Sequence, residues 1–230
     1  DSGGGTWADA ASRYNIGLGV ATLSDALNGA DGNIAVGYQS GRYVTTGDNN
    51  VFVGKQAGDA VTTESGIIAI GLGAAGAIST TGDYSIAIGH GSMGGAQIGD
   101  GNIAIGYQSM QNANSSAFHH NTAIGYQTMA NVGSNGPDDT TALGYLAGNA
   151  ITTANENTLI GSYAGQSITT GGYNIFVGKD AGNKMVSGSA NVAVGTSAFY
   201  YSQGASQNVA VGQAAGQNLT AATGQVHIGY

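Results

Sequence analysis

The chain has 230 residues, including 42 glycines, one proline and no cysteine, and only 8% of its residues are charged. So few charges exclude the usual composition of a disordered chain, the lack of cysteine excludes a disulfide-stapled scaffold, and no apolar run reaches the roughly 20 residues of a membrane-spanning helix. The net charge of −8, with five scattered Lys and Arg residues, excludes a nucleic-acid surface, because phosphate affinity depends on cationic side chains.

The chain divides into a short N-terminal segment and a long repeat region. Residues 1–14 (DSGGGTWADAASRY) belong to no repeat and are expected to act as a cap or docking segment, with Trp7 as its anchor. From residue 15 to residue 230, a glycine preceded by an aliphatic residue recurs every 17 to 19 residues, and we call it the repeat glycine. The repeat glycines are Gly19, Gly37, Gly54, Gly71, Gly89, Gly106, Gly125, Gly144, Gly161, Gly178, Gly195, Gly212 and Gly229. A period this constant predicts stacked units that contact only their neighbours.

Each repeat has the pattern of one short β-strand. Aliphatic residues or threonine stand one and three residues before the repeat glycine, a small residue usually lies between them, and nine repeats have Asn four residues before it. β-Branched residues favour strands, and Asn favours turns because it bonds nearby backbone and tolerates left-handed geometry. A second extended segment and two turns are expected to use the remaining residues. The fold class is therefore all-β: a parallel β-solenoid, or β-roll, of about 13 rungs.

The two faces of such a strand are both apolar, and this leaves two arrangements. Successive side chains point to opposite faces, so the aliphatic pairs face outward with the alanines in the lumen, or the reverse. An outward aliphatic stripe of this length exceeds the few hundred Å² that soluble monomers usually expose, which favours self-association. The expected interface residues are Ile34, Val36, Val51, Val53, Ile68, Ile70, Ile86, Ile88, Ile103, Ile105, Ile175, Val177, Val192, Val194, Val209 and Val211.

The strand motif resembles that of a known family. The segments NIAVG (33–37), NIAIG (102–106) and NVAVG (191–195 and 208–212) resemble the NSVAIG repeat in the head domains of trimeric autotransporter adhesins. The segments NVFVGKQAG (50–58) and NIFVGKDAG (174–182) are similar to repeats of bacteriophage tail fibres and of cyanobacterial and algal surface proteins. The resemblance implies a homotrimeric, left-handed parallel β-roll with its aliphatic residues toward the threefold axis. The repeats here are longer than those of the adhesin heads.

No constellation of catalytic residues is evident, so we expect no enzymatic activity and no cofactor. The string GLGAAG (71–76) lies inside the repeat and not at a strand-to-helix turn, which argues against a dinucleotide site. Aspartates recur six residues before the repeat glycine, where a calcium ladder and simple turn formation are the alternatives, and Ser65 interrupts the series. The four are Asp31, Asp48, Asp83 and Asp100. Turn formation is the preferred interpretation, so no metal is expected, although His119 and His120 could form a metal or anion site in a trimer.

Ligand-binding residues are expected where the repeats carry extra aromatic residues or extra length. Tyr107, Tyr126 and Tyr145 follow the repeat glycine in consecutive repeats and should stack, either for stability or to present a surface for sugar or protein. The two 19-residue spacings place extra residues in 111–120 and 130–140, and insertions in repeat arrays often mark a binding face. Loop variation without function is the alternative. The expected ligand or receptor residues are Tyr107, Tyr126, Tyr145, Phe118, His119, His120, Asn135, Asp138 and Asp139.

Three functions fit the sequence. The first is a non-enzymatic extracellular fibre or adhesin module, on a cell surface or virion, that binds a cell-surface glycan or protein receptor. The second is a filament subunit that stacks end to end. Residues 225–230 carry no polar capping segment, so we expect another domain or another subunit to cover this end. The third is an ice-binding solenoid, suggested by recurrent threonine pairs such as Thr45–Thr46. Adjacent residues of an extended segment face opposite ways, which weighs against the third.

Overall fold

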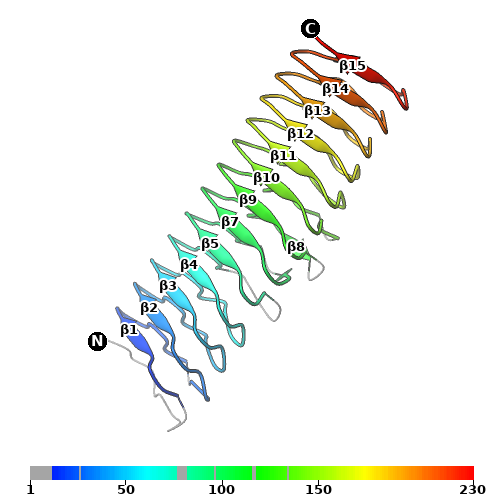
Figure 1. Ribbon diagram of the computed structural model, residues 1–230. Coiled ribbons are helices and arrows are strands. Elements are labelled where there is room, and N and C mark those ends of the chain that lie inside the picture. Colours follow the sequence, from blue (N-terminus) through cyan, green and yellow to red (C-terminus); the bar gives the residue numbers. More distant parts are fainter. Residues whose placement is uncertain (1–11, 26, 77–81, 96, 116–117, 134) are drawn as a thin grey trace.

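The chain folds into a straight ladder of parallel strands (Figure 1). The computed structural model describes residues 12–25, 27–76, 82–95, 97–115, 118–133 and 135–230, and these contain strands and turns but no helix. The all-β parallel solenoid of about 13 rungs is therefore confirmed. Most of the expected N-terminal cap, including Trp7, lies outside the described residues.

Thirteen three-residue strands form the main sheet, one for each repeat. Their order is β1-β2-β3-β4-β5-β7-β9-β10-β11-β12-β13-β14-β15, and every neighbouring pair is parallel. The bounds are β1 Ile16–Leu18, β2 Ile34–Val36, β3 Val51–Val53, β4 Ile68–Ile70, β5 Ile86–Ile88, β7 Ile103–Ile105, β9 Thr122–Ile124, β10 Thr141–Leu143, β11 Thr158–Ile160, β12 Ile175–Val177, β13 Val192–Val194, β14 Val209–Val211 and β15 Val226–Ile228.

The prediction of a second extended segment in every rung is largely wrong. Only β6 (Gln97–Ile98) and β8 (Asn114–Ser115) form a second, two-stranded sheet among the described residues. Elsewhere the far wall of each rung consists of turns and bends, yet its backbone still bonds from rung to rung. The amide nitrogen of Thr45, for example, lies 2.8 Å from the carbonyl oxygen of Thr62. Stacking therefore satisfies the backbone of both walls without two regular sheets.

The alternation of the main strands decides which face is inside. Ala35 and Ala69, at the centres of β2 and β4, are fully buried, whereas Ile34 and Val53 each expose 37% of their surface. The alanines therefore fill the narrow lumen and the aliphatic pairs face outward. The opposite arrangement, with the aliphatic pairs inside, is wrong, because a lumen this narrow accepts a small residue at the strand centre.

The lumen keeps its volume by exchanging large and small residues between two positions. Phe52 replaces alanine at the centre of β3, and a Cβ placed on Gly58, four residues after the repeat glycine, would lie 2.2 Å from the Phe52 ring. In the rungs of Ala87, Ala104, Ala123 and Ala193 the later position carries a fully buried Met or Phe, such as Met110, whereas in the rung of Ala35 it is Gly41, and the Phe52 ring of the next rung lies against it. The two positions therefore fill one space from opposite sides.

The repeat glycine is required by both conformation and contact. Gly54 has φ +134°, and a Cβ placed there would lie 2.6 Å from the carbonyl oxygen of Gly71 in the next rung. A side chain would therefore collide with backbone that cannot move without breaking the stack. The recurrence of glycine in the sequence has this steric origin.

The asparagine that precedes nine of the thirteen main strands has a different role from the one expected. The left-handed backbone belongs to the residue that precedes it, as at Asn49 (φ 57°) and His120 (φ 56°). Asn50 is buried, its Oδ1 accepts the Ile67 amide hydrogen at 2.8 Å, and its Nδ2 donates to the Glu64 carbonyl at 2.9 Å. Such asparagines bridge one rung to the next, so they satisfy buried backbone groups instead of forming the left-handed turn.

Candidate functional site

The aliphatic face is an apolar surface that follows the main sheet along the rod. It consists of the residues one and three positions before each repeat glycine, and all the expected interface residues belong to it. Ile70, Ile175 and Val194 expose between 38% and 44% of their surface, and the rows continue over all thirteen strands in unbroken register. Because each strand adds two side chains at the same place, the rows are straight, although the first position is threonine in β9, β10 and β11. This regularity suits contact with an equally regular surface.

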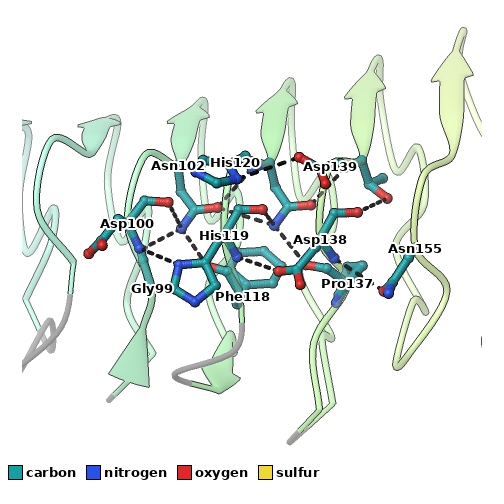
Figure 2. Close-up of polar contacts among 12 residues, drawn as sticks. Gly99, Asp100, Asn102, Phe118, His119, His120, Pro137, Asp138, Asp139 and Asn155 are labelled. Atoms are coloured by element: carbon teal, nitrogen blue, oxygen red, sulfur yellow. Dashed lines mark hydrogen bonds and ion pairs between the residues drawn. The ribbon is translucent and has the colours of Figure 1, made fainter.

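The beginnings of the strands form a polar edge, which we define as Asp100, His119, His120, Asp138, Asp139 and Asn155 (Figure 2). The backbone N–H of Asp100 donates to Nδ1 of His119 at 2.9 Å, and the N–H of His119 donates to Oδ1 of Asp138 at 2.7 Å. The N–H of Asp138 donates to Oδ1 of Asn155 at 3.2 Å. Each side chain therefore accepts the amide hydrogen of the rung before it.

The same ladder runs through the earlier aspartates, so their recurrence is explained without a metal. The N–H of Asp31 donates to Oδ1 of Asp48 at 2.7 Å, and the N–H of Asp48 donates to the Ser65 hydroxyl at 3.0 Å. The N–H of Ser65 in turn donates to Asp83 at 2.8 Å. Ser65 therefore continues the ladder and does not interrupt it. Any side chain with an acceptor of the right reach can occupy this position, including the His119 imidazole.

A second row of charges lies one residue further along the polar edge. His120 Nδ1 is 3.5 Å from Oδ1 of Asp139, and both side chains are mostly exposed, so the pair adds little stability. Beyond them, a hydrogen bond to Glu156 raises the pKa of Tyr173. The rings of His119 and His120 are tilted, with centroids 5.9 Å apart. In the part of the chain that the structure describes, no three His, Cys, Asp or Glu residues group in a way that could hold a metal ion.

Phe118 does not belong to any surface site. It is fully buried, because it enters the lumen beneath the polar edge, and a Cβ placed on Gly136 would lie 2.7 Å from its ring. Its carbonyl accepts the side-chain amide of buried Asn102 at 2.6 Å. Its inclusion among the ligand-binding residues is therefore wrong, because its side chain fills the lumen.

The ends of the strands carry a row of aromatic rings, the tyrosine stripe, which consists of His90, Tyr107, Tyr126, Tyr145 and Tyr163. The centroids of Tyr107 and Tyr126 lie 5.0 Å apart with 13° between the ring planes, and those of Tyr126 and Tyr145 lie 5.3 Å apart with 20°. The expected stack of three tyrosines is confirmed. His90 and Tyr163 meet its two ends edge-on, at 5.3 Å and 5.1 Å.

Polar groups accompany the tyrosine stripe. Nε2 of Gln127 donates to Oε1 of Gln108 at 2.8 Å, so the residues after two of the tyrosines also form a ladder. Partial burial and the neighbouring Tyr145 raise the pKa of Tyr163, which is therefore a neutral hydroxyl at physiological pH. The stripe thus presents phenol and amide groups that both donate and accept hydrogen bonds.

The structure separates the expected binding residues into different places. The three tyrosines lie where the strands end, and the two histidines with Asp138 and Asp139 lie where the strands begin. Asn135 is exposed in a turn of the far wall. Ser115 still pairs with Ile98 and His119 still accepts from Asp100, so the extra residues of the first longer repeat fall between Ser115 and His119, and those of the second fall between Gly133 and Pro137. The longer repeats therefore enlarge the turn region of the far wall and leave the polar edge unchanged.

Sequence reasoning missed several members of both groups. His90 follows a repeat glycine as the tyrosines do, so the same offset would have placed it in the stripe. Tyr163 stands one residue later, and only its left-handed backbone (φ 61°) explains how it reaches Tyr145. Asn155 stands at the aspartate position of its repeat, and that offset marked it as part of the polar edge.

The threonine pairs divide their roles between the two members. The hydroxyl of Thr45 donates to the carbonyl of Thr62 at 3.0 Å, and that of Thr152 donates to the carbonyl of Thr169 at 3.0 Å. The second threonine of each described pair, such as Thr46, is exposed. Thr80 and Thr81 lie outside the described residues. Three of the eight hydroxyls in the described pairs, those of Thr45, Thr152 and Thr169, thus join neighbouring rungs.

Comparisons with known proteins add no relative: no family model, no curated protein and no solved structure matches the chain. Within the described residues, there is no helix with the length and apolar character needed to cross a membrane.

Proposed function

We propose that this chain is a non-enzymatic extracellular fibre or adhesin module, a rigid rod that associates with copies of itself and attaches to a cell or host surface. One observation carries the proposal: the aliphatic face runs along the rod in two straight rows, of which one is aliphatic in all thirteen strands and the other carries threonine in β9, β10 and β11. A soluble protein rarely leaves a continuous apolar surface of this length open to water. Burial against identical rows of other copies removes it from water without any change of fold.

Three copies are the number proposed, because the resemblance of the strand motif to trimeric adhesin heads implies it. Repetition supports the same arrangement physically. Matching rows in each copy let every rung contribute an equal contact, so the interface strengthens with each rung. Three parallel rods would also present three copies of any surface site, which raises avidity for a multivalent target.

The test is the native mass of the purified chain, measured by light scattering after size exclusion. The expected mass is three times the chain mass of 22.6 kDa. The double variant Ile88→Glu/Ile105→Glu should shift the protein to monomer, because it buries two charges in the interface of adjacent rungs. The matched control Thr153→Glu/Thr170→Glu places the same charges on exposed positions of two adjacent rungs away from the aliphatic face, and it should stay trimeric.

Two results would contradict the proposal. A discrete monomer with normal circular dichroism would show that the aliphatic face tolerates water. Open-ended polymers that survive the Ile88→Glu/Ile105→Glu change would show that association uses the ends of the rod, as in the filament alternative. Binding of the intact protein to cells, measured by flow cytometry, tests the attachment half of the proposal separately.

A further inference from the structure

Among the residues that the structure describes, the tyrosine stripe is the one exposed aromatic row that continues over several rungs without a charged side chain. Tyr107, Tyr126 and Tyr145 expose 40%, 44% and 43% of their surface. Between His90 and Tyr163, the two residues after each repeat glycine include no Lys, Arg, Asp or Glu. Lys55 and Lys179 occupy the corresponding position only in rungs outside the stripe. The row is therefore polar, uncharged and accessible.

The stacking geometry decides which part of each ring a ligand can reach. Each of the three tyrosines has both ring faces covered, either by another tyrosine or by the edge-on rings of His90 and Tyr163. The ring edges and the hydroxyl groups of Tyr107 and Tyr126 remain, while the Tyr145 hydroxyl already shares a hydrogen bond with Tyr163. A ligand that needs an open aromatic face finds none here, whereas one rich in hydroxyl groups meets a row of partners that both donate and accept hydrogen bonds.

The distance between neighbouring rings restricts which polymer can bind along the stripe, because the length per unit of the polymer must match it. Ring centroids recur at 5.0 and 5.3 Å along the rod. An extended peptide rises about 3.3 Å per residue, so neither one residue nor two match the rungs. Nucleic acid is disfavoured by the net charge of −8 and the absence of cations in the stripe. A pyranose in an extended β-1,4-linked chain advances by about the distance between neighbouring β-strands. One sugar therefore falls on each rung, and because successive sugars are turned over, the same sugar face recurs at every second rung.

We infer that the tyrosine stripe binds an extended, neutral β-1,4-linked polysaccharide that lies along the rod, with one sugar residue to each rung. Tyr107, Tyr126 and Tyr145 bond the sugar hydroxyls through their phenol groups, and the amides of Gln108 and Gln127 supply further partners. The main-sheet strands fix the spacing, because their register is unbroken from β5 to β11. This inference rests on the proposed attachment function and names the chemical class of its target.

The experiment measures binding of the purified intact chain to soluble oligosaccharides by calorimetry. Cellohexaose and chitohexaose are the extended probes, and maltohexaose, whose α-linkage curves the chain, is the control. Affinity should rise with length from two to about five sugars, because the stripe spans five rungs, and maltohexaose should not bind. Absence of binding to both extended hexasaccharides, or equal binding of maltohexaose, would overturn the inference.

One substitution separates hydrogen bonding from aromatic contact. Tyr126→Phe keeps the ring stack and removes one hydroxyl, so affinity for the bound hexasaccharide should fall roughly tenfold, the loss expected for one hydrogen bond left unpaired. The matched control is Tyr84→Phe, which removes an exposed hydroxyl outside the stripe. An unchanged affinity of Tyr126→Phe would show that the hydroxyl row does not read the sugar.

Cell binding, measured in parallel, separates this inference from the function on which it rests. If the intact protein binds cells and neither extended hexasaccharide competes, the polysaccharide inference is wrong and the attachment function stands. If the protein binds no cells but binds the hexasaccharides, the attachment function is wrong and the stripe remains a polysaccharide site.

Discussion

The exchange of large and small residues within the lumen leads to a compensating pair of substitutions. Phe176 at the centre of β12 is fully buried, and a Cβ placed on Gly182 would lie 2.3 Å from its ring. Phe176→Ala should lower the free energy of unfolding by about 3–5 kcal/mol, through lost burial and an open cavity. Gly182→Met alone should also destabilise, because the side chain collides with the ring.

Together the two changes recreate a combination that the chain already uses. Ala104 pairs with Met110, which is fully buried at φ 52°, and Gly182 already has φ 60°. The methionine needs no new backbone conformation and fills the space that the phenylalanine leaves. The double variant should therefore be more stable than Phe176→Ala by about 2 kcal/mol, close to the value of burying one methionine side chain.

The assay is chemical denaturation of all four proteins at one protein concentration, followed by circular dichroism. The coupling free energy of the double-mutant cycle should be favourable and about 2–3 kcal/mol or more. Additive destabilisation, with the double variant at or below the sum of the single variants, would refute the idea that the two positions fill one space.

The other predictions concern the backbone contacts, the asparagine row and one carboxyl group. Gly125→Ala should cost at least about 2 kcal/mol, measured by denaturant unfolding, because its Cβ would lie 2.4 Å from the carbonyl oxygen of Gly144 at φ +138°. Asn121→Ala should cost about 2–3 kcal/mol in the same assay, since the buried amide of Thr140 loses its 3.0 Å acceptor. Partial burial raises the pKa of the Asp59 carboxyl above 3.8 in the folded protein, so ionisation of this group opposes folding. The protonated carboxyl contributes stability below pH 3.8, and this contribution is lost as the pH rises through the raised pKa. Asp59→Asn should consequently raise the melting temperature at pH 7 more than at pH 3, as measured by scanning calorimetry.

Controls for these variants come from equivalent residues in open surroundings. Gly73→Ala meets no atom within 4 Å and should cost no more than about 1 kcal/mol. Asn112→Ala removes an exposed side chain and should change the free energy of unfolding by no more than about 0.5 kcal/mol. A loss at Asn112 equal to that at Asn121 would contradict the role assigned to burial. A higher melting temperature for Asp59→Asn at pH 3 than at pH 7, relative to the parent, would contradict the sign of the Asp59 argument.

The sequence by itself determined the period, the strands, their parallel order and the stacked tyrosines. These follow from a local pattern that repeats, since the same residues at the same offset must occupy the same place in every rung. The repeat also predicted that Tyr107, Tyr126 and Tyr145 share one row, which the structure confirms. It left open which face of the strand is inside, because alternation gives two faces and no direction.

Only the tertiary structure decided what each polar side chain bonds. From its own repeat alone, Asn50 is predicted to form a turn, and Ser65 is predicted to interrupt the row of aspartates. In the structure both side chains bridge adjacent rungs. Phe118 reads as a loop residue and fills the lumen, because its environment depends on how the extra residues of its repeat are accommodated. Partners in this rod lie 17 to 19 residues away in sequence, so a residue's own neighbours do not reveal the atom that faces it in the next rung.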